Sequence, residues 1–191
     1  ELKFSKQLFL LKRLKKEGLG TAYVEGFKWA LKKKFNYVFE MDADLSHNPK
    51  DIKRILEPML INDYDMSIGS RYIKGINVVN WPLSRIILSY TASIYVRIIT
   101  KMKIQDSTSG YVCYKKTVLE SINLDSINFS GYAFQIEMKY KTYLKNFKII
   151  EVPIVFTDRK YGLSKLNGSI ISEAIFGVLS MRIKNIFNIK F

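Results

Sequence analysis

The chain has 191 residues, 48% of them apolar, and its 31 lysines and arginines exceed its 17 aspartates and glutamates, giving a net charge of +14. This length and composition predict one domain with a sizeable buried core and exclude a disordered, collagen-like or low-complexity protein. The positive surplus favours an anionic partner: a nucleic acid, an anionic membrane or a phosphorylated ligand. With one cysteine, Cys113, and one histidine, an internal disulfide and a His/Cys zinc cluster are excluded, so any metal site must use oxygen ligands.

The N-terminal part of the chain predicts two helices. In residues 1–17, Leu8, Leu11 and Leu14 fall at helical spacing among charged residues, which predicts the end of an amphipathic helix with these leucines facing inward. Because a domain rarely begins within a helix, we expect the chain to be a fragment that lacks N-terminal elements. A second amphipathic helix is predicted over residues 18–34, where Gly26 and Ala30 would let another backbone approach.

A strand–helix–strand unit follows. Residues 35–41 are dense in aromatic and β-branched residues and predict a strand that ends at Asp42-Ala-Asp44. A helix is predicted to begin at Asn48 and Pro49, and a second strand over residues 64–68 ends just before Arg71. This order predicts an α/β fold with a mostly parallel sheet, whose ligands lie beyond the carboxyl ends of the strands.

The rest of the chain continues the alternation of helices and strands. In order, the sequence predicts a helix over residues 82–100, a strand over 109–114, a helix over 131–146, a strand over 148–156, a basic loop over 157–168 and a final helix. No segment has the ~18 or more nearly uncharged apolar residues that a membrane span needs. We expect residues 1–168 to form the catalytic domain and residues 169–191 an amphipathic helix, packed on the core or lying on a membrane surface.

Asp42 and Asp44 form the sharpest candidate site. Two carboxylates one residue apart at the end of a buried strand can hold Mg²⁺ or Mn²⁺ together with a diphosphate, because hard cations prefer oxygen ligands. The alternatives are two solvated turn aspartates or a cap for the next helix.

Three arginines are candidate phosphate ligands, because the planar guanidinium suits phosphate oxygens: Arg71, Arg85 and Arg159. Arg85, Ser89 and Ser93 are spaced four residues apart and share one face of the predicted helix, beside an apolar surface that suits a lipid phosphate. The loop from Arg159 to Lys165 could close over a phosphate. An ordinary surface arginine and a solvated basic turn are the respective alternatives.

The remaining polar residues of interest have structural interpretations. Glu137 could face a site, but a surface charge is favoured. Asp106 could cap or orient another group, and a structural cap is favoured. His47 is interpreted as a loop residue beside the aspartate pair, and Cys113 as a core residue.

Several short stretches, in this order, resemble the polyprenol-phosphate sugar transferases, above all the dolichol-phosphate mannose synthases of inverting glycosyltransferase family 2. They are Gly18-Leu-Gly-Thr-Ala22, Asp42-Ala-Asp-Leu-Ser-His47, Gly69-Ser-Arg-Tyr72, Trp81-Pro-Leu-Ser-Arg85, Asp106-Ser-Thr-Ser-Gly110, Gly131-Tyr-Ala-Phe-Gln-Ile-Glu137, Glu151-Val-Pro-Ile154 and Phe156-Thr-Asp-Arg159 with Ser164-Lys165. The resemblance implies a GT-A, nucleotide-binding-like fold. It also implies that two first strands of the family, which help bind the nucleotide, are missing from this chain.

The resemblance assigns roles to particular residues. It implies that Asp42, Asp44 and the position of Ser46 hold the divalent metal and the donor diphosphate, with Asp44 taking part in catalysis. Arg71 and Arg85 match positions that grip the acceptor phosphate during catalysis. The remaining substrate-binding positions are Ser89 and, on a mobile loop over the site, Arg159 and Lys165.

The implied reaction transfers mannose from GDP-mannose to a polyprenyl or dolichyl phosphate with inversion. The alternatives are a lipid-phosphate glycosyltransferase that uses UDP-glucose or a related sugar, and an inactive subunit of a membrane complex. No nucleic acid is expected, because the sequence carries no RNA-binding signature. We expect a peripheral location on the cytoplasmic face of a membrane, the endoplasmic reticulum in a eukaryote or the plasma membrane in a prokaryote, with small membrane-anchoring subunits as further partners.

Overall fold

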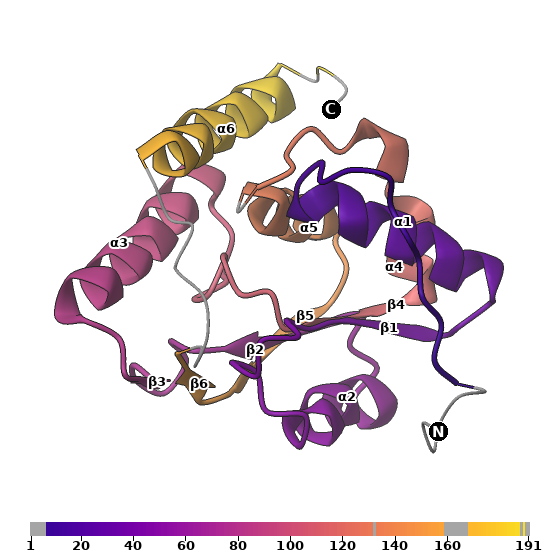
Figure 1. The fold of residues 1–191 in the computed structure, drawn as a ribbon. Helices are drawn as coiled ribbons and strands as arrows, with labels where there is room; N and C mark the ends of the chain where they lie inside the picture. Colours follow the sequence, from indigo (N-terminus) through magenta and orange to yellow (C-terminus); the bar gives the residue numbers. More distant parts are fainter. Residues whose placement is uncertain (1–6, 132, 159–167, 188, 190–191) are drawn as a thin grey trace.

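The computed structural model of the chain describes residues 7–131, 133–158, 168–187 and 189. In this part a central sheet is covered by helices on both faces (Figure 1). The elements are, in order, α1 Leu19–Lys32, β1 Tyr37–Glu40, α2 Asp51–Ile61, β2 Met66–Ser70, β3 Val78–Val79, α3 Leu83–Thr100, β4 Val112–Lys115, α4 Lys116–Ser121, the 3₁₀ helix η1 Leu124–Ser126, α5 Ala133–Leu144, β5 Ile149–Pro153, β6 Phe156–Thr157 and α6 Gly168–Ile186.

The central sheet has four strands in the order β1-β4-β2-β5. Strands β2 and β5 pair in parallel, whereas β4 is antiparallel to both of its neighbours, with Cys113 opposite Phe39 on β1 and opposite Ser67 on β2. Three of the four strands therefore point in one direction, and the reversed strand lies between two of them. The carboxyl ends of β1 and β2 consequently meet at one edge of the sheet, where the sequence predicts the site.

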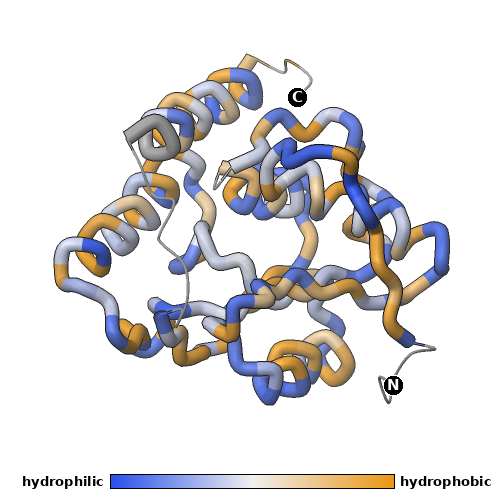
Figure 2. Tube along the Cα trace, in the orientation of Figure 1, coloured by the Kyte–Doolittle hydropathy of each residue, from blue (hydrophilic) through white to orange (hydrophobic). Residues whose placement is uncertain are grey.

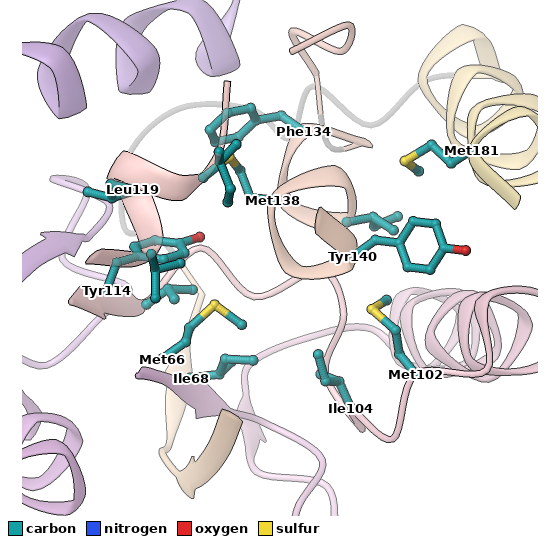
Figure 3. Packing of buried hydrophobic residues seen from close by; sticks show 14 of the residues in the cluster. Met66, Ile68, Met102, Ile104, Tyr114, Leu119, Phe134, Met138, Tyr140 and Met181 are labelled. Carbon is teal, nitrogen blue, oxygen red and sulfur yellow. The ribbon is translucent and has the colours of Figure 1, made fainter. Parts of the chain in front are cut away.

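Each face of the sheet has its own hydrophobic cluster. The larger cluster lies between the sheet and the helices α1, α3, α4, α5 and α6, and Figure 3 shows Met66 and Ile68 of β2 facing this space with Met138 and Tyr140 of α5. The smaller cluster lies beneath α2, where Ile55 and Met59 pack against Cys113. Burial on both faces explains why β1 and β4 carry apolar residues at successive positions, such as Val38 and Phe39, and Val112 and Cys113.

The final helix packs on the core and also leaves apolar side chains exposed. Val178 and Met181 of α6 are buried in the larger cluster, and α6 packs against α3 and α5 (Figure 1). Hydrophobic residues recur along both α3 and α6 (Figure 2), and some of them, such as Ile98 and Phe176, are 69% exposed. Across the described residues, no helix combines the length and the apolarity needed to cross a bilayer.

The prediction for the N-terminal residues is wrong for the part that the structure describes. Residues 7–18 form no helix, and Leu8, Leu11 and Leu14 are exposed rather than inward-facing. Tertiary contacts hold the segment instead. The ring of Phe9 lies 5.0 Å from that of Trp29, and the guanidinium of Arg13 donates to Thr21.

Other differences lie at the ends of elements. Strand β4 begins at Val112, three residues later than predicted. In the preceding loop, Ser109 bonds to the Gly69 carbonyl of β2 through its side chain and not through its backbone. Helix α2 begins at Asp51, since Asn48 forms a preceding turn in which its side chain accepts from the Lys50 amide. The short elements β3, α4, η1 and β6 were not predicted. Gly26 does not receive another backbone, because nothing among the described residues lies within 4 Å of its Cβ position.

Candidate functional site

The loop after β1 places two carboxylates at the carboxyl edge of the sheet. Asp42 and Asp44 are both partly exposed, and the turn between them and α2 is closed by Leu45 in the left-handed region, with φ 67°. The backbone amide of Ser46 donates to Asp44 Oδ1 at 3.1 Å. The Ser46 side chain is buried, and its Oγ has no hydrogen-bond partner among the described residues. Two carboxylates and an unused hydroxyl thus lie on one tight loop.

His47 fixes this loop against the sheet. Its Nδ1 accepts from the Asp42 backbone amide at 3.2 Å, and its ring stacks on Tyr111 with 4.7 Å between centroids. Burial, assisted by the positive charge of Arg71, lowers the pKa of His47 to about 4. The imidazole is therefore neutral at physiological pH, with its proton on Nε2. His47 lies in a loop beside the aspartate pair, as the sequence predicts, and its buried side chain forms a wall of the site.

Arg71 follows β2 and forms a buried ion pair with Asp106. Its Nε donates to Asp106 Oδ2 at 2.7 Å and its Nη2 to Asp106 Oδ1 at 2.6 Å, while Nη2 also reaches Thr108 Oγ1 at 2.8 Å. Burial alone would raise the pKa of Asp106, but the charge and hydrogen bonds of Arg71 outweigh it and hold that pKa below its usual range. The favoured expectation that Asp106 is a cap is therefore wrong, because the residue is fully buried, neutralises Arg71 and takes the alternative, orienting role.

Arg85 and Ser89 lie one turn apart on α3 and face the same site. Nη1 of Arg85 donates to Asp158 at 2.8 Å, and its guanidinium lies over Trp81, 4.0 Å from the ring centroid. Ser89 Oγ accepts from the Tyr72 hydroxyl at 2.6 Å. Ser93, one turn further, is buried below them. The spacing that predicts a shared polar face for these residues is thus present in the structure.

A cavity of about 430 Å³ joins these residues. Its polar end is lined by Asp42, His47, Arg71 and Arg85, with the ring of Trp81 alongside. Its other end lies between α3, α5 and α6 and is apolar, being lined by Leu88, Ala92, Tyr95, Val96, Ile136, Ala174 and Ile175. One cavity therefore offers charged groups at one end and an apolar surface at the other.

A buried polar layer that the sequence did not predict lies beneath the site. Glu40, Gln135 and Lys139 are each almost fully buried, and Gln135 Nε2 donates to Glu40 Oε2 at 2.6 Å. Burial raises the pKa of Glu40 and lowers that of Lys139. A glutamate inside the apolar strand before Asp42 is the signal that could have revealed this layer, since a carboxylate is buried only with partners.

Glu137 is also buried, which makes the expectation of a surface charge wrong. Its carboxylate accepts from the amides of Asn128 and Phe129 at 3.0 and 3.1 Å and pairs with Lys141 at 3.2 Å. It therefore fixes the turn before α5 and does not face the cavity. Two predicted site residues, Arg159 and Lys165, lie outside the described residues.

Among the described residues no three His, Cys, Asp or Glu side chains cluster in a way that could hold a metal ion by themselves. A cation on Asp42 and Asp44 would thus need further oxygen ligands, and the buried, unused hydroxyl of Ser46 and a bound diphosphate fit that need. The residues present fit a hard divalent cation whose shell is completed by phosphate and water.

Comparisons with known proteins agree with this geometry. The polyprenol monophosphomannose synthase of Mycolicibacterium smegmatis is 42% identical over 178 residues, which are 93% of this chain and 67% of that protein. The undecaprenyl-phosphate mannosyltransferase of Micrococcus luteus is 42% identical over 169 residues, covering 88% of this chain and 69% of the relative. The chain thus spans about two thirds of the length of these relatives.

The fold has a counterpart among solved structures. A glucosyl-3-phosphoglycerate synthase of Mycobacterium tuberculosis, solved with Mn²⁺ and UDP-glucose, superposes with a TM-score of 0.62 at 14% identity, covering 89% of this chain and 56% of the other. This likeness shows the GT-A fold that the sequence predicts. The model of glycosyl transferase family 2 matches residues 2–123. The family model and the two relatives that are 42% identical show that the chain belongs to glycosyl transferase family 2.

Proposed function

We propose that this glycosyltransferase moves a mannosyl residue from GDP-mannose to a polyprenyl or dolichyl phosphate with inversion at the sugar C1. The observation that carries the proposal is the cavity with a charged end at Asp42, Arg71 and Arg85 and an apolar end between α3 and α6. An acceptor with an anionic phosphate head and an apolar hydrocarbon chain would match these two ends. The names of the two relatives that are 42% identical support this acceptor class and the transferred sugar.

The charged end suits the acceptor phosphate. Arg71 and Arg85 bring two guanidinium groups to one end of the cavity, and each is oriented by a carboxylate, Asp106 or Asp158. The stacking of Arg85 on Trp81 further fixes the plane of its guanidinium. Arginines held in this way lose little freedom on binding a phosphate, so positioning the nucleophile costs less entropy.

The acceptor needs little help to attack. A phosphate monoester has a second pKa of ~6 and is already a dianion for the most part at neutral pH. A general base is therefore unnecessary for this reaction, and none of the described cavity residues has to act as one. The work of the protein is to hold the anionic nucleophile in line with the sugar carbon and to exclude water.

Asp42, Asp44 and Ser46 are the residues that would hold a divalent cation, Mg²⁺ or Mn²⁺. When bound, the cation supplies positive charge that stabilises the departing diphosphate. Asp44 is oriented for this role by the Ser46 amide, and the Asp42 backbone is oriented by His47.

We also propose that the outer face of α3 and α6 lies on the cytoplasmic face of a membrane, with the protein held peripherally. Large apolar side chains are exposed along both helices: Leu83, Ile87 and Ile98 on α3, and Phe176, Ile183 and Ile186 on α6. The apolar end of the cavity is lined by residues of the same two helices, which suits entry of a lipid chain from the bilayer. The net charge of +14 would add attraction to anionic lipids. Small anchoring subunits could share this face.

The test is sugar transfer to a short polyprenyl phosphate. We expect label from GDP-mannose to appear in the lipid with Mg²⁺ or Mn²⁺ and to disappear with a chelator. Asp42→Ala should lower turnover at least ~100-fold, whereas Asp125→Ala, an exposed aspartate on η1, should retain it. Transfer from UDP-glucose alone would replace the proposed donor, and a near-normal rate for Asp42→Ala would contradict the metal assignment.

A further inference from the structure

Lys139 is a buried ammonium group that the proposed reaction does not use. It lies on α5 with no exposed surface, and its Nζ donates to the Ser109 carbonyl at 2.7 Å and to the backbone and side-chain oxygens of Gln135 at 3.3 Å each. These acceptors match the three N–H groups of an ammonium. Burying a lysine is costly, so its presence here calls for a role that an apolar residue could not fill.

The carbonyl that Lys139 holds belongs to the loop between the two halves of the site. At one end of this loop, Asp106 grips Arg71. At its other end Gly110 lies close to Asp42, since a Cβ atom on Gly110 would be 3.8 Å from Asp42 Oδ1. Ser109 lies in between, where its Oγ donates to the Gly69 carbonyl of β2 at 2.6 Å. The loop thus spans the distance from Asp42 to Arg71.

Lys139 also reaches the strand that carries the aspartate pair. Gln135, which accepts from Lys139, donates to Glu40 only two residues before Asp42. The charges of Glu40 and Asp106 both favour the ammonium form of Lys139. A row of buried ionisable groups, acidic and basic in alternation, therefore runs beneath the site, from Glu40 through Lys139 and Asp106 to Arg71.

We propose that Lys139 is a positioning residue that fixes the spacing between Asp42 at the end of β1 and Arg71 at the end of β2, through Ser109 and Gln135. The proposal rests on the proposed function, in which these two ends bind the donor diphosphate and the acceptor phosphate. An in-line displacement is sensitive to this spacing, because a misplacement of ~1 Å can cost ~100-fold in rate. Removing Lys139 would loosen the loop and lower the rate without removing any group that touches a substrate.

The test uses a charge-balanced variant and a matched control. Lys139→Met with Glu40→Gln removes the ammonium and neutralises its partner, which avoids a buried unpaired charge. Lys141→Met with Glu137→Gln removes a buried lysine–glutamate ion pair within α5. Its atoms lie 3.2 Å apart, and it faces the turn at Ser126 rather than the cavity. We expect both variants to lose thermal stability, so stability alone does not distinguish them.

Amide hydrogen exchange over residues 105–111 and steady-state kinetics separate positioning from general destabilisation. In the Lys139 variant we expect exchange of this segment to rise ~10-fold or more and kcat to fall ~10–100-fold, at a temperature where both variants remain folded. The control should leave both quantities near the wild-type values.

Unchanged exchange relative to the control would overturn the proposal, and so would raised exchange with a normal kcat. If the wild-type protein transfers no sugar, the proposed function fails, while the exchange experiment still decides whether Lys139 holds the loop.

Discussion

Arg71 and Asp106 neutralise each other's charge inside the protein, and this pairing fixes both the orientation and the charge that Arg71 presents to a ligand. The bidentate contact fixes the guanidinium in one orientation, and the backbone amide of Arg71 also donates to Asp106 Oδ2 at 2.9 Å. Asp106 is itself fixed to β5, since its backbone amide donates to Glu151 at 2.8 Å. The residue that the sequence predicts as a phosphate ligand is therefore oriented in advance, with part of its charge already balanced.

Asp106→Asn tests how much this pair stabilises the fold. At pH 7 we expect a loss of about 3 kcal/mol in the free energy of unfolding, because the variant leaves a buried guanidinium without its counter-ion. The pKa of Asp106 is lower in the folded protein than the ~3.9 of an unfolded chain, so its contribution is present above that value and is lost as the pH falls through the folded pKa. Urea unfolding at pH 7 and at about pH 3 should show the difference between wild type and variant shrinking in acid. A difference independent of pH would contradict the assignment.

The sequence predicts some of these residues and not others for a physical reason. Asp42, Arg71 and Arg85 follow or begin recognisable elements, so the topology of an α/β sheet brings them together without knowledge of side-chain contacts. The burial of Asp106, Glu137 and Lys139 depends on partners distant in the chain. The sequence shows that a charged residue is present, but it does not show that another element of the fold covers that residue.

At the scale of elements, the sequence predicts the long helices and the four strands of the central sheet, but it does not predict how these strands pair. Helices α1, α3 and α5 have clear periodicity or caps in the sequence, and the structure has them within a few residues of the predicted ends. The insertion of β4 between β1 and β2 pairs segments that are distant in the chain, and no local pattern indicates it. Residues 7–18 show the converse, since helical spacing of leucines is not sufficient where no partner face covers them.

Two glycines on α1 offer a matched test of this helix. Gly20 is in close contact with the turn before α5, because a Cβ atom there would be 2.5 Å from the Phe129 carbonyl oxygen. Gly26 has nothing within 4 Å of its Cβ position among the described residues. We expect Gly26→Ala to stabilise the protein by about 0.5–1 kcal/mol, since alanine favours a helix over glycine. Gly20→Ala should destabilise it by about 1–3 kcal/mol through overpacking. Equal effects in thermal unfolding would contradict the packing of α1.

At the scale of the whole molecule, the two faces of the sheet are unequal. Among the described residues, eighteen buried hydrophobic residues form the cluster beneath α1 and α5, and six form the cluster beneath α2. The site lies at the edge of the sheet, with its polar layer built into the larger side. Helix α2 packs only on the smaller cluster, so its detachment exposes less apolar surface than opening the opposite face. We therefore expect the face of the sheet that α2 covers to open before the face that α1 and α5 cover.

Cys113 reports this opening. It lies on β4 in the smaller cluster, fully buried, and burial raises the pKa of its thiol to about 12, so that a thiol reagent reacts only after α2 moves away. Met59→Ala beneath α2 should speed labelling, because truncating a buried methionine costs about 2–5 kcal/mol and the loss falls on the opening step. Met138→Ala removes a similar side chain from the larger cluster, so it should lower global stability comparably yet leave the labelling rate near wild type. Should both variants speed labelling equally, Cys113 would become accessible only by global unfolding, and the two faces would form one cooperative unit.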